Sequence, residues 1–571
     1  MTAKPLADVE RIKAASRLLR GTIEESLADP VTGALAADDT QLIKFHGSYQ
    51  QDDRDVRAER RQALLEPAYS FMVRVRIPGG ICTSRQWLDL DALAGRHANG
   101  TLRLTTRQTI QFHGILKRDL KASLAAIDAT LLNTLAACGD VNRNVMSATL
   151  PVQRALHEEV LAVARDLSDH LLPRTRAYHE IWLGAERVTP EVEEVEPIYG
   201  RNYLPRKFKI GMAVPPDNDV DVFTQDLGYL AIVEDGRLVG FDVTAGGGMG
   251  MSFGEPATYP RLGDVLGFCT PEQALAVAVA VVTAQRDLGD RTDRKHARLK
   301  YTIDTVGLDA FRTEVERRQG FAFAPARPYA FSHTGDRFGW FGDDRGLWHF
   351  GLFVEGGRIT DRGAWRARSG LRAIAERHAP EFRLTANQNL LISGIDPDDR
   401  GRVAALLAEY GIDGTSEHPA RQLALACVGL PTCGLAMADS ERYIADFMTR
   451  FESLLARHGL ADEEITVRMT GCPNGCARPY VAEVALVGKA PGRYNLYLGG
   501  AFDGSRLNAQ YRENLDEPAL LAALDPLLAA YAGHRQSGER FGDFLVRTGI
   551  VPAIGSGRAF AAATLRPGAG T

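Results

Sequence analysis

The sequence predicts an α+β protein built around an internal duplication, and three observations lead to this prediction. Residues 102–115 (LRLTTRQTIQFHGI) and 382–395 (FRLTANQNLLISGI) are identical at six of fourteen aligned positions. A pair of glycines precedes each copy, at Gly79-Gly80 and at Gly356-Gly357. Strand-like and helix-like segments are mixed without strict alternation, which favours α+β over a doubly wound fold. We therefore expect a pseudo-two-fold arrangement with mixed sheets.

Length and composition narrow the class of protein. A chain of 571 residues predicts three or four domains. Its net charge of -5 does not suggest a nucleic-acid-binding protein. The longest apolar run, residues 274–282, is too short to cross a bilayer, and the first twenty residues lack the apolar core of a signal peptide. We expect a cytoplasmic protein that binds neither nucleic acid nor a membrane.

The N-terminal segment, residues 1–65, is polar and rich in charge. This composition suggests an arm that binds a partner; a helical lid packed on the body is the alternative. In residues 103–113 polar and mostly apolar positions alternate, which predicts a strand with one polar face. That face carries two arginines and no acid, which suits an anion. Residues 271–287 and 440–455 are expected to be helical.

Four of the seven cysteines lie within 50 residues of one another, in CVGLPTC and CPNGC. Four thiolates are what a 4Fe–4S cluster requires, and the Pro-Asn-Gly turn lets the second pair converge. A zinc site normally uses more closely spaced pairs, and four unrelated buried cysteines would not all fall in two short segments that both contain Gly and Pro. The predicted metal ligands are Cys427, Cys433, Cys472 and Cys476.

These cysteine pairs, separated by 38 residues, occur together with KFHGSYQQDDRD, RLTTRQTIQFHG, VNRNVM, YLPRKFK, RTDRKHARLKY and TANQNL. The set resembles the siroheme-dependent sulfite and nitrite reductases from about residue 40 to residue 550. The resemblance implies a pseudo-two-fold, three-domain α+β fold with an N-terminal arm. It also implies that all four cysteines hold a 4Fe–4S cluster and that Cys476 additionally ligates the siroheme iron.

Siroheme carries many carboxylates and sulfite is an anion, so the resemblance requires a site lined with cations. A single arginine is usually a surface ion pair, but a set of buried cations needs a polyanion. The family's substrate contacts fall on Arg76, Arg143, Lys207 and Lys209. The contacts to siroheme carboxylates fall on Arg103, Arg107, Gln111, His113, Arg206 and Arg298.

The function implied is the assimilatory reduction of sulfite to hydrogen sulfide by six electrons, for cysteine biosynthesis. Lys207 and Lys209 would donate protons through water, while Arg76 and Arg143 would stabilise negative charge. A siroheme nitrite reductase is the alternative, and Lys209 distinguishes the two because a neutral Asn is typical there in nitrite enzymes. A non-catalytic iron–sulfur carrier is a third possibility, which predicts a protein without haem absorption bands.

No NADPH or flavin site is evident in the sequence, so electrons are expected from another protein. A diflavin (FAD/FMN) NADPH sulfite reductase flavoprotein is the first choice, and ferredoxin is the alternative. Deleting residues 1–60 is then expected to abolish NADPH-driven activity and to spare activity with an artificial dye. The glycine-rich run 245–251 lacks the pattern of a P-loop and predicts a close backbone contact instead.

The predicted domains are the arm (1–65), a discontinuous ferredoxin-like repeat domain (66–147 and 346–424), a central siroheme and substrate domain (148–345) and a cluster-binding domain (425–571). The three core domains are expected to converge at the cofactors. Tyr49 and Cys138 both lie in matched or adjacent stretches, so a covalent Tyr–Cys link is one hypothesis. A buried free thiol is the other.

Overall fold

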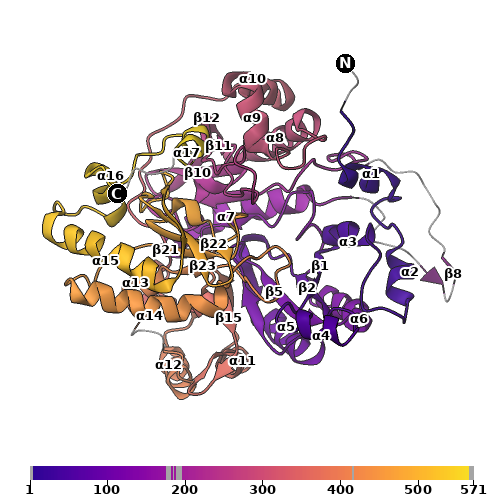
Figure 1. The fold of residues 1–571 in the computed structure, drawn as a ribbon, viewed down its shortest axis with the longest axis horizontal. Coiled ribbons are helices and arrows are strands. Elements are labelled where there is room, and N and C mark those ends of the chain that lie inside the picture. The colour runs from indigo at the N-terminus through magenta and orange to yellow at the C-terminus, as the bar shows by residue number, and fades with distance from the viewer. Residues whose placement is uncertain (1–3, 175–181, 184–185, 188–195, 414–416, 565–571) are drawn as a thin grey trace.

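The computed structural model describes residues 4–174, 182–183, 186–187, 196–413 and 417–564 (Figure 1). Helices and strands are mixed along the chain, and the described residues form four five-stranded sheets. These sheets make two similar pairs, which confirms the α+β class and the internal duplication. None of the described helices is both long enough and apolar enough to cross a membrane.

The first pair of sheets contains the two repeat copies, and each sheet takes one edge strand from the other copy. The register pairs Arg358 with Arg103 in one sheet and Ile81 with Arg383 in the other. The two copies are therefore interlocked. In order across each sheet, the strands are β1 (Ser48–Asp52), β2 (Tyr69–Arg74), β5 (Ile110–Ile115), β4 (Leu102–Leu104) and β15 (Arg358–Ile359), and β13 (Gly339–Gly342), β14 (Trp348–Leu352), β19 (Leu390–Ile395), β18 (Glu381–Leu384) and β3 (Ile81–Thr83).

The glycine pairs explain how the copies can exchange strands. Gly80 and Gly357 have φ values of +75° and +74°, which L side chains rarely adopt. A Cβ on Gly80 would lie 2.5 Å from the carbonyl oxygen of Leu384, and one on Gly357 would lie 2.4 Å from that of Leu104. Only glycine allows each chain crossing to approach the other copy's strand this closely.

Helices cover this pair of sheets and pack against one another at its centre. They are α5 (Ser84–His97), α6 (Lys117–Asp128), α11 (Ala367–His378) and α12 (Arg400–Glu409). Helix α5 begins at a capping box, in which the Thr83 hydroxyl accepts from the Gln86 amide at 3.2 Å. The Trp87 ring of α5 stacks on Phe382 of β18, with centroids 4.7 Å apart, so a single core serves both copies.

The second pair of sheets repeats one pattern of two parallel and two antiparallel pairings. The strands are β6 (Met146–Ser147), β9 (Ile210–Ala213), β10 (Leu227–Glu234), β11 (Arg237–Ala245) and β12 (Asp264–Cys269), and β20 (Leu425–Ala426), β21 (Val467–Thr470), β22 (Val484–Ala490), β23 (Arg493–Leu498) and β24 (Ala509–Leu515). Taken in this order, each strand of the first sheet has the same position and pairing direction as its counterpart in the second. The duplication therefore extends beyond the repeat that the sequence revealed.

Separate helices accompany each of these two sheets (Figure 1). The first set is α7 (Arg154–His170), α8 (Ala274–Leu288), α9 (Leu299–Val306) and α10 (Leu308–Gln319), and the second is α14 (Glu441–Arg457), α15 (Glu517–His534), α16 (Phe541–Arg547) and α17 (Gly557–Thr564). Helices α8 and α14 confirm the two helical predictions. The core of each half is a large apolar cluster of its own.

The N-terminal segment packs on the body instead of standing apart from it. It contains α1 (Asp8–Ala15), α2 (Ile23–Ala28), α3 (Asp39–Leu42), β1 and α4 (Arg57–Gln62). Leu19 and Phe45 are almost completely buried, and β1 pairs with β2 along its whole length. Residues 8–52 therefore resemble the packed lid of the alternative interpretation, and a partner-binding role for them stays a prediction.

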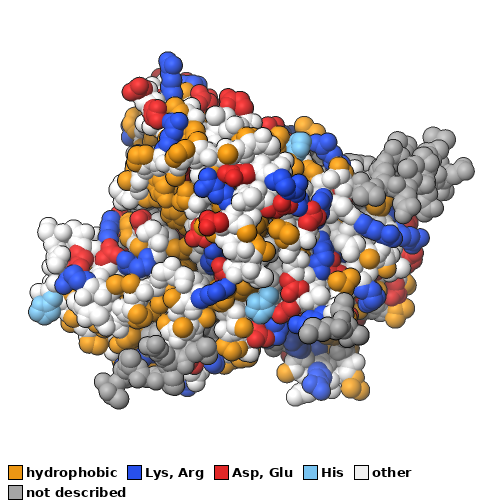
Figure 2. Space-filling model, turned by 90° about the horizontal axis from the view of Figure 1, so that it is seen from above, with side chains coloured by type: hydrophobic (Ala, Val, Ile, Leu, Met, Phe, Trp, Pro, Cys, Tyr) orange, Lys and Arg blue, Asp and Glu red, His pale blue; other side chains and the backbone are white. Residues whose placement is uncertain are grey.

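The molecular surface shows no single dominant charge on the face seen in Figure 2. Acidic and basic side chains lie next to one another there, with apolar side chains between them. The concentration of one sign of charge that the sequence predicts is therefore not found on this face.

Candidate active site

The two cysteine pairs follow two neighbouring parallel strands. Cys427 comes directly after β20, and Cys472 comes two residues after β21. The strands pair in parallel, with Ala426 opposite Met469, so their carboxyl ends meet at one edge of the sheet. The Cys427 amide donates to the Met469 carbonyl oxygen at 3.2 Å, which holds the two loops together.

The thiols of these loops act on one another electrostatically. Burial raises the pKa of Cys433 to about 11, and the charges of Cys476 and Cys427 raise it further in the same direction. Burial likewise raises the pKa of Cys472 to about 12, again with contributions from Cys476 and Cys427. All four predicted ligands therefore lie near one another.

Hydrogen bonds from the loop after β21 reach sulfur atoms in both loops. The Gly471 amide donates to Cys427 Sγ at 3.1 Å, and the Asn474 side-chain amide donates to Cys472 Sγ at 3.4 Å. Among the described residues, no three His, Cys, Asp or Glu side chains are close enough to bind one metal ion. A cubane is larger than an ion and has its four thiolate ligands spread around it, so the arrangement fits a cluster and not a single metal.

Half-buried cations gather on the side of Cys476. Burial and, next, the charge of Arg206 lower the pKa of Lys207 to about 7, although the Cys476 thiolate opposes the shift. Burial and the charge of Lys207 lower the pKa of Lys209 well below its usual range, and Cys476 again opposes. Two lysines from the segment before β9 therefore lie beside a thiol from the loop after β21.

Arginines from other segments complete this cluster. Burial lowers the pKa of Arg107 to about 9, with further lowering by Arg478 and Arg143. Burial lowers the pKa of Arg206 to about 10, with Arg294 adding to the effect. We use the name cation cluster for the six half-buried residues Arg74, Arg107, Arg143, Arg206, Lys207 and Lys209. Within the described ranges none of the six forms an ion pair with a carboxylate.

Three predicted arginines differ from this cluster because they are buried and paired. Arg103 binds Glu441 at 2.7 Å and Arg298 binds Asp226 at 2.6 Å. Arg76 donates to Ser168 at 2.6 Å and to Asp169 at 2.7 Å, both from α7. The structure therefore keeps Arg103 and Arg298 as neutralised neighbours of the site, and it turns Arg76 towards α7.

Arg74 is a cation of this site to which the sequence assigned no contact. Strand β2 ends at Arg74, so Arg74 and Arg76 do not lie on one strand face. The Arg74 guanidinium donates to Cys138 Sγ at 3.2 Å. Its charge also acts on Arg107 and His113. The end of β2 is the feature that distinguishes Arg74 from Arg76.

Tyr49 and Cys138 border the same cluster. Burial and the charge of Cys138 raise the pKa of Tyr49, which also forms a side-chain hydrogen bond with Arg143. Cys138 is a buried free thiol. The two side chains are therefore neighbours, and the covalent link between them stays a hypothesis.

Several buried donors in this region lack a protein partner. In the part of the chain that the structure describes, neither ring nitrogen of His113 has a hydrogen-bond partner, and the Nε atoms of Arg107 and Arg298 have none. Unsatisfied buried donors are costly, and unpaired buried cations are more so. A large polyanion with several carboxylates satisfies both needs, so the residues present fit a siroheme.

The glycine-rich run 245–251 approaches the second cysteine loop closely. The Met251 amide donates to the Pro473 carbonyl oxygen at 2.9 Å. A Cβ on Gly475 would lie 2.8 Å from the Met249 carbonyl oxygen, and one on Gly248 would lie 3.1 Å from the Arg298 guanidinium. The predicted close backbone contact is therefore one between this run and the CPNGC turn.

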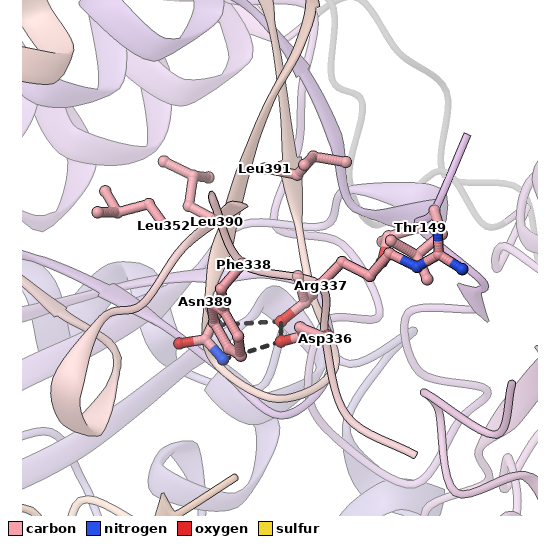
Figure 3. Close-up of a pocket in the computed structure, with 10 residues that line it drawn as sticks. Thr149, Asp336, Arg337, Phe338, Leu352, Asn389, Leu390 and Leu391 are labelled. Atoms are coloured by element: carbon pink, nitrogen blue, oxygen red, sulfur yellow. Dashed lines mark hydrogen bonds between the residues drawn. The ribbon is translucent and has the colours of Figure 1, made fainter. Parts of the chain in front are cut away.

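A small cavity lies in a different place, beside the second repeat copy (Figure 3). Its volume is about 10 Å³, close to that of one water molecule. Asp336 and Asn389 line it and are hydrogen-bonded to each other at 2.8 Å. This volume is too small for a cofactor. None of the predicted site residues lines the cavity, so it is also in the wrong place.

Comparison with known proteins agrees with this site. A model of the nitrite/sulfite reductase ferredoxin-like half domain matches residues 65–130 and 342–410, which are the interlocked copies. A model of the nitrite and sulphite reductase 4Fe-4S domain matches residues 163–323. The latter range contains Cys269 but none of the four clustered cysteines, which lie in the sheet that repeats its topology.

Full-length relatives identify the family. Proteins named sulfite reductase [NADPH] hemoprotein beta-component from Myxococcus xanthus and Bacillus subtilis are 60% and 56% identical to this chain. The matches cover 96% and 97% of this chain and 98% and 97% of the relatives. The Mycobacterium tuberculosis NirA protein shares the fold, with a TM-score of 0.77, 23% identity and coverage of 95% and 97% of the two chains. The chain therefore belongs to the nitrite and sulfite reductase family, in the group of sulfite reductase hemoprotein beta-components.

Proposed function

We propose that this chain is the catalytic subunit of an assimilatory, NADPH-dependent sulfite reductase, which reduces sulfite to hydrogen sulfide for cysteine biosynthesis. One observation carries the proposal. The charge of Cys476 acts on the pKa of both Lys207 and Lys209, so the two ammonium groups lie near this thiol. Neither lysine has a carboxylate partner among the described residues. This arrangement supports an anion-binding site next to a thiol of the cysteine quartet. Its cofactors, a siroheme and a 4Fe–4S cluster, supply the electrons when bound.

We assign the cofactor contacts from this arrangement. Cys427, Cys433, Cys472 and Cys476 hold the cluster, and Cys476 also ligates the siroheme iron. The siroheme carboxylates are bound by Arg103, Arg107, Gln111, His113, Arg206 and Arg298. Within this set His113, Arg107 and Arg206 carry most of the binding, because Arg103 and Arg298 already have carboxylate partners.

Substrate binding and proton supply fall to the rest of the cation cluster. Arg143, Lys207 and Lys209 hold the substrate oxygens, and Arg74 takes the place that the sequence assigned to Arg76. The pKa of Lys207 is lowered to about 7, so this ammonium group gives up a proton near neutral pH. The guanidinium groups of Arg74 and Arg143 retain their protons and stabilise negative charge that develops on oxygen.

The proposal is tested by a visible spectrum and by turnover of two substrates. The purified holoenzyme should show a siroheme Soret band, which a plain iron–sulfur carrier would lack. With reduced methyl viologen as donor it should turn over sulfite to sulfide. Lys209→Asn should lower kcat/KM for sulfite about tenfold or more and affect nitrite turnover less. Efficient turnover of nitrite alone by the wild-type enzyme would favour the nitrite reductase alternative.

We also propose the electron donor, the domain division and the location. The relatives' names contain NADPH and a beta-component, which supports a flavoprotein partner over ferredoxin; adding each reduced donor to the enzyme distinguishes them. The predicted division into residues 66–147 with 346–424, 148–345 and 425–571 follows the sheets, although β13 begins at Gly339 and β6 already belongs to the central sheet. Seven free cysteines suit the reducing cytoplasm.

A further inference from the structure

The segment that carries the two lysines is held by cations immediately before it. Three consecutive carbonyl oxygens each accept a hydrogen bond from a different cationic side chain. Arg291 donates to Tyr203 at 2.6 Å, Lys13 donates to Leu204 at 2.8 Å, and Arg294 donates to Pro205 at 3.3 Å. Because Arg206 follows directly, this backbone sets the starting direction of the segment before β9 that carries Lys207 and Lys209.

Two buried acids balance the three cations. Glu10 binds Lys13 and Arg291, each at 2.5 Å. Asp140 accepts two hydrogen bonds from Arg294, at 2.8 and 3.0 Å, and lies 3.7 Å from Lys13. The side chains of Lys13, Glu10 and Asp140 are 0%, 1% and 4% exposed. Burying these charges is costly unless geometry and hydrogen bonds compensate, so this is a built network. We call these five residues the carbonyl clamp.

The carbonyl clamp also reaches the segment that carries Arg143. The Leu204 amide donates to the Asp140 carbonyl oxygen at 3.0 Å. Further along, the Phe208 amide donates to Val141 at 3.1 Å, and the Arg143 amide donates to Phe208 at 2.9 Å. Asp140 therefore joins two adjacent stretches of chain, and these stretches contribute four members of the cation cluster, Arg143, Arg206, Lys207 and Lys209.

Tyr203 shows why the backbone needs this support. Its φ is +55°, a conformation that costs energy for any residue other than glycine. Its ring packs between Phe45 and Tyr199, with centroids 5.2 and 5.6 Å away. The strained turn is thus fixed from one side by aromatic rings and from the other by the carbonyl clamp.

We propose that Glu10 and Lys13 of α1 are positioning residues for the sulfite reductase site, acting through Leu204 on Lys207 and Lys209. The proposal rests on the proposed function of those two lysines. It gives the N-terminal segment a role inside the catalytic subunit, separate from any partner. Deleting residues 1–60 should then impair activity with an artificial dye as well as with NADPH, in contrast to the expectation from sequence.

The test compares two substitutions on the same helix of the holoenzyme. Lys13→Met removes the bond to Leu204 and preserves most of the side-chain volume. Arg11→Ala is the matched control, because Arg11 is exposed and contacts only Asp38, at 3.6 Å, among the described ion pairs. The measurements are kcat and KM with reduced methyl viologen, siroheme and iron content, and amide hydrogen exchange of residues 203–209.

We expect Lys13→Met to keep its cofactors, to raise the KM for sulfite, and to lower kcat/KM about tenfold, since displacement of a catalytic group by ~1 Å can cost up to about a hundredfold. The KM for methyl viologen should stay constant, which a general loss of structure would not permit. Amide exchange in residues 203–209 should be faster in this variant only. Unchanged kinetics and unchanged exchange would overturn the proposal.

Two further outcomes separate this proposal from the proposed function. If the wild-type holoenzyme does not reduce sulfite, the proposed function is wrong. Faster amide exchange of residues 203–209 in Lys13→Met would then show that Lys13 supports this backbone, but it could no longer be a positioning residue for sulfite reduction. If the wild type reduces sulfite and only the variant's kinetics are unchanged, the positioning proposal alone fails. Should Lys13→Met not fold, Glu10→Gln is judged by the same measurements, because it weakens the support of both Lys13 and Arg291.

Discussion

In the first copy of the repeat, Arg107 lies in the turn between β4 and β5, and in the second copy Asn387 takes the same position between β18 and β19. The backbones of the two turns agree closely. The next residue in each, Gln108 and Gln388, has a positive φ of +53° and +68°. Each glutamine also reaches the sheet next to its own copy, Gln108 through Ser147 of β6 and Gln388 through Ala426 of β20.

The surroundings of the two turns differ in charge: cations predominate around Arg107, whereas Asn387 contacts an acid as well as Arg478, which donates to its side-chain oxygen at 3.1 Å. Arg107 lies among Arg74 and Arg143 of the cation cluster. Asn387 instead donates to Asp336 at 3.0 Å and to the Asp219 carbonyl oxygen at 3.1 Å, beside the cavity of Figure 3. The second copy fills its site with the protein's own carboxylates and leaves room for about one water molecule. Duplication thus preserved the scaffold, while a few charged positions differ between the copies, and on our proposal these positions make the first copy the one that binds the anionic cofactor.

The largest expected effect comes from giving the first copy the residue of the second. Arg107→Asn should remove a cation that faces the siroheme carboxylates and lower dye-driven sulfite reduction about a hundredfold. Siroheme content, read from the Soret band, should fall in parallel. Arg366→Asn, an exposed arginine near the second copy, serves as control. A variant with Asn at 107 and full siroheme content would contradict the assignment.

The surroundings of the turn in the second copy should affect how the free energy of unfolding depends on pH, through Asp219. Burial raises the pKa of Asp219 to about 8, and the neighbouring charges of Asp336 and Asp217 add to the effect. The unfolded chain releases this proton near pH 4, as free Asp side chains do at about 3.9. Between the two pKa values only the folded protein holds the proton, so its free energy of unfolding falls with rising pH, by about 1.4 kcal/mol per pH unit.

Asp219→Asn should therefore flatten the pH dependence of the free energy of unfolding between pH 5 and 7, measured by urea titration of the cofactor-loaded enzyme. The exposed Asp235→Asn should leave the slope as in the wild type. If both variants and the wild type share one slope, Asp219 is already ionised in the folded state and the comparison of the two copies loses its electrostatic basis.

A matched pair of substitutions in β5 and β19 should have different consequences. His113 has two buried ring nitrogens without a partner among the described residues. Its counterpart Ser393 lies 2.9 Å from His349 Nδ1. His113→Ala should weaken siroheme retention by about 1.5 to 3 kcal/mol, measured by Soret absorbance during dialysis. Ser393→Ala should cost about 1 kcal/mol of stability and leave siroheme retention unchanged; the reverse pattern would exchange the roles of the copies.

The smallest effect concerns the glycines that follow these two residues. Gly114 and Gly394 both have a φ of +76°. A Cβ on Gly394 meets no atom within 4 Å, whereas one on Gly114 lies 3.2 Å from the Cβ of Asn99. Gly394→Ala should lower the free energy of unfolding by about 1 kcal/mol from backbone strain alone, and Gly114→Ala by slightly more. Urea titration measures both, and a larger loss in Gly394→Ala would contradict this account.

Much of the fold was predictable because its signals are local. The repeat, the alternating strand face and the apolar helices all depend on residues close together in sequence. The exchange of β3 and β15 between the copies was not predictable from these signals, although the glycine pairs mark the crossings. The packing of residues 8–52 on the body was only the alternative prediction, because their polar composition conceals buried residues such as Lys13 and Glu10.

The candidate site shows the same division between local and distant effects. By itself the sequence determined the ligand chemistry: four thiols in two turn-rich loops and a surplus of cations in strand-like segments, because spacing and residue type are properties of short stretches. Tertiary structure alone decided which cations remain unpaired for a polyanion. Arg76, Arg103 and Arg298 are neutralised by Asp169, Glu441 and Asp226, and Arg74 is not. Such pairing depends on carboxylates from distant parts of the chain, whose positions only the folded protein establishes.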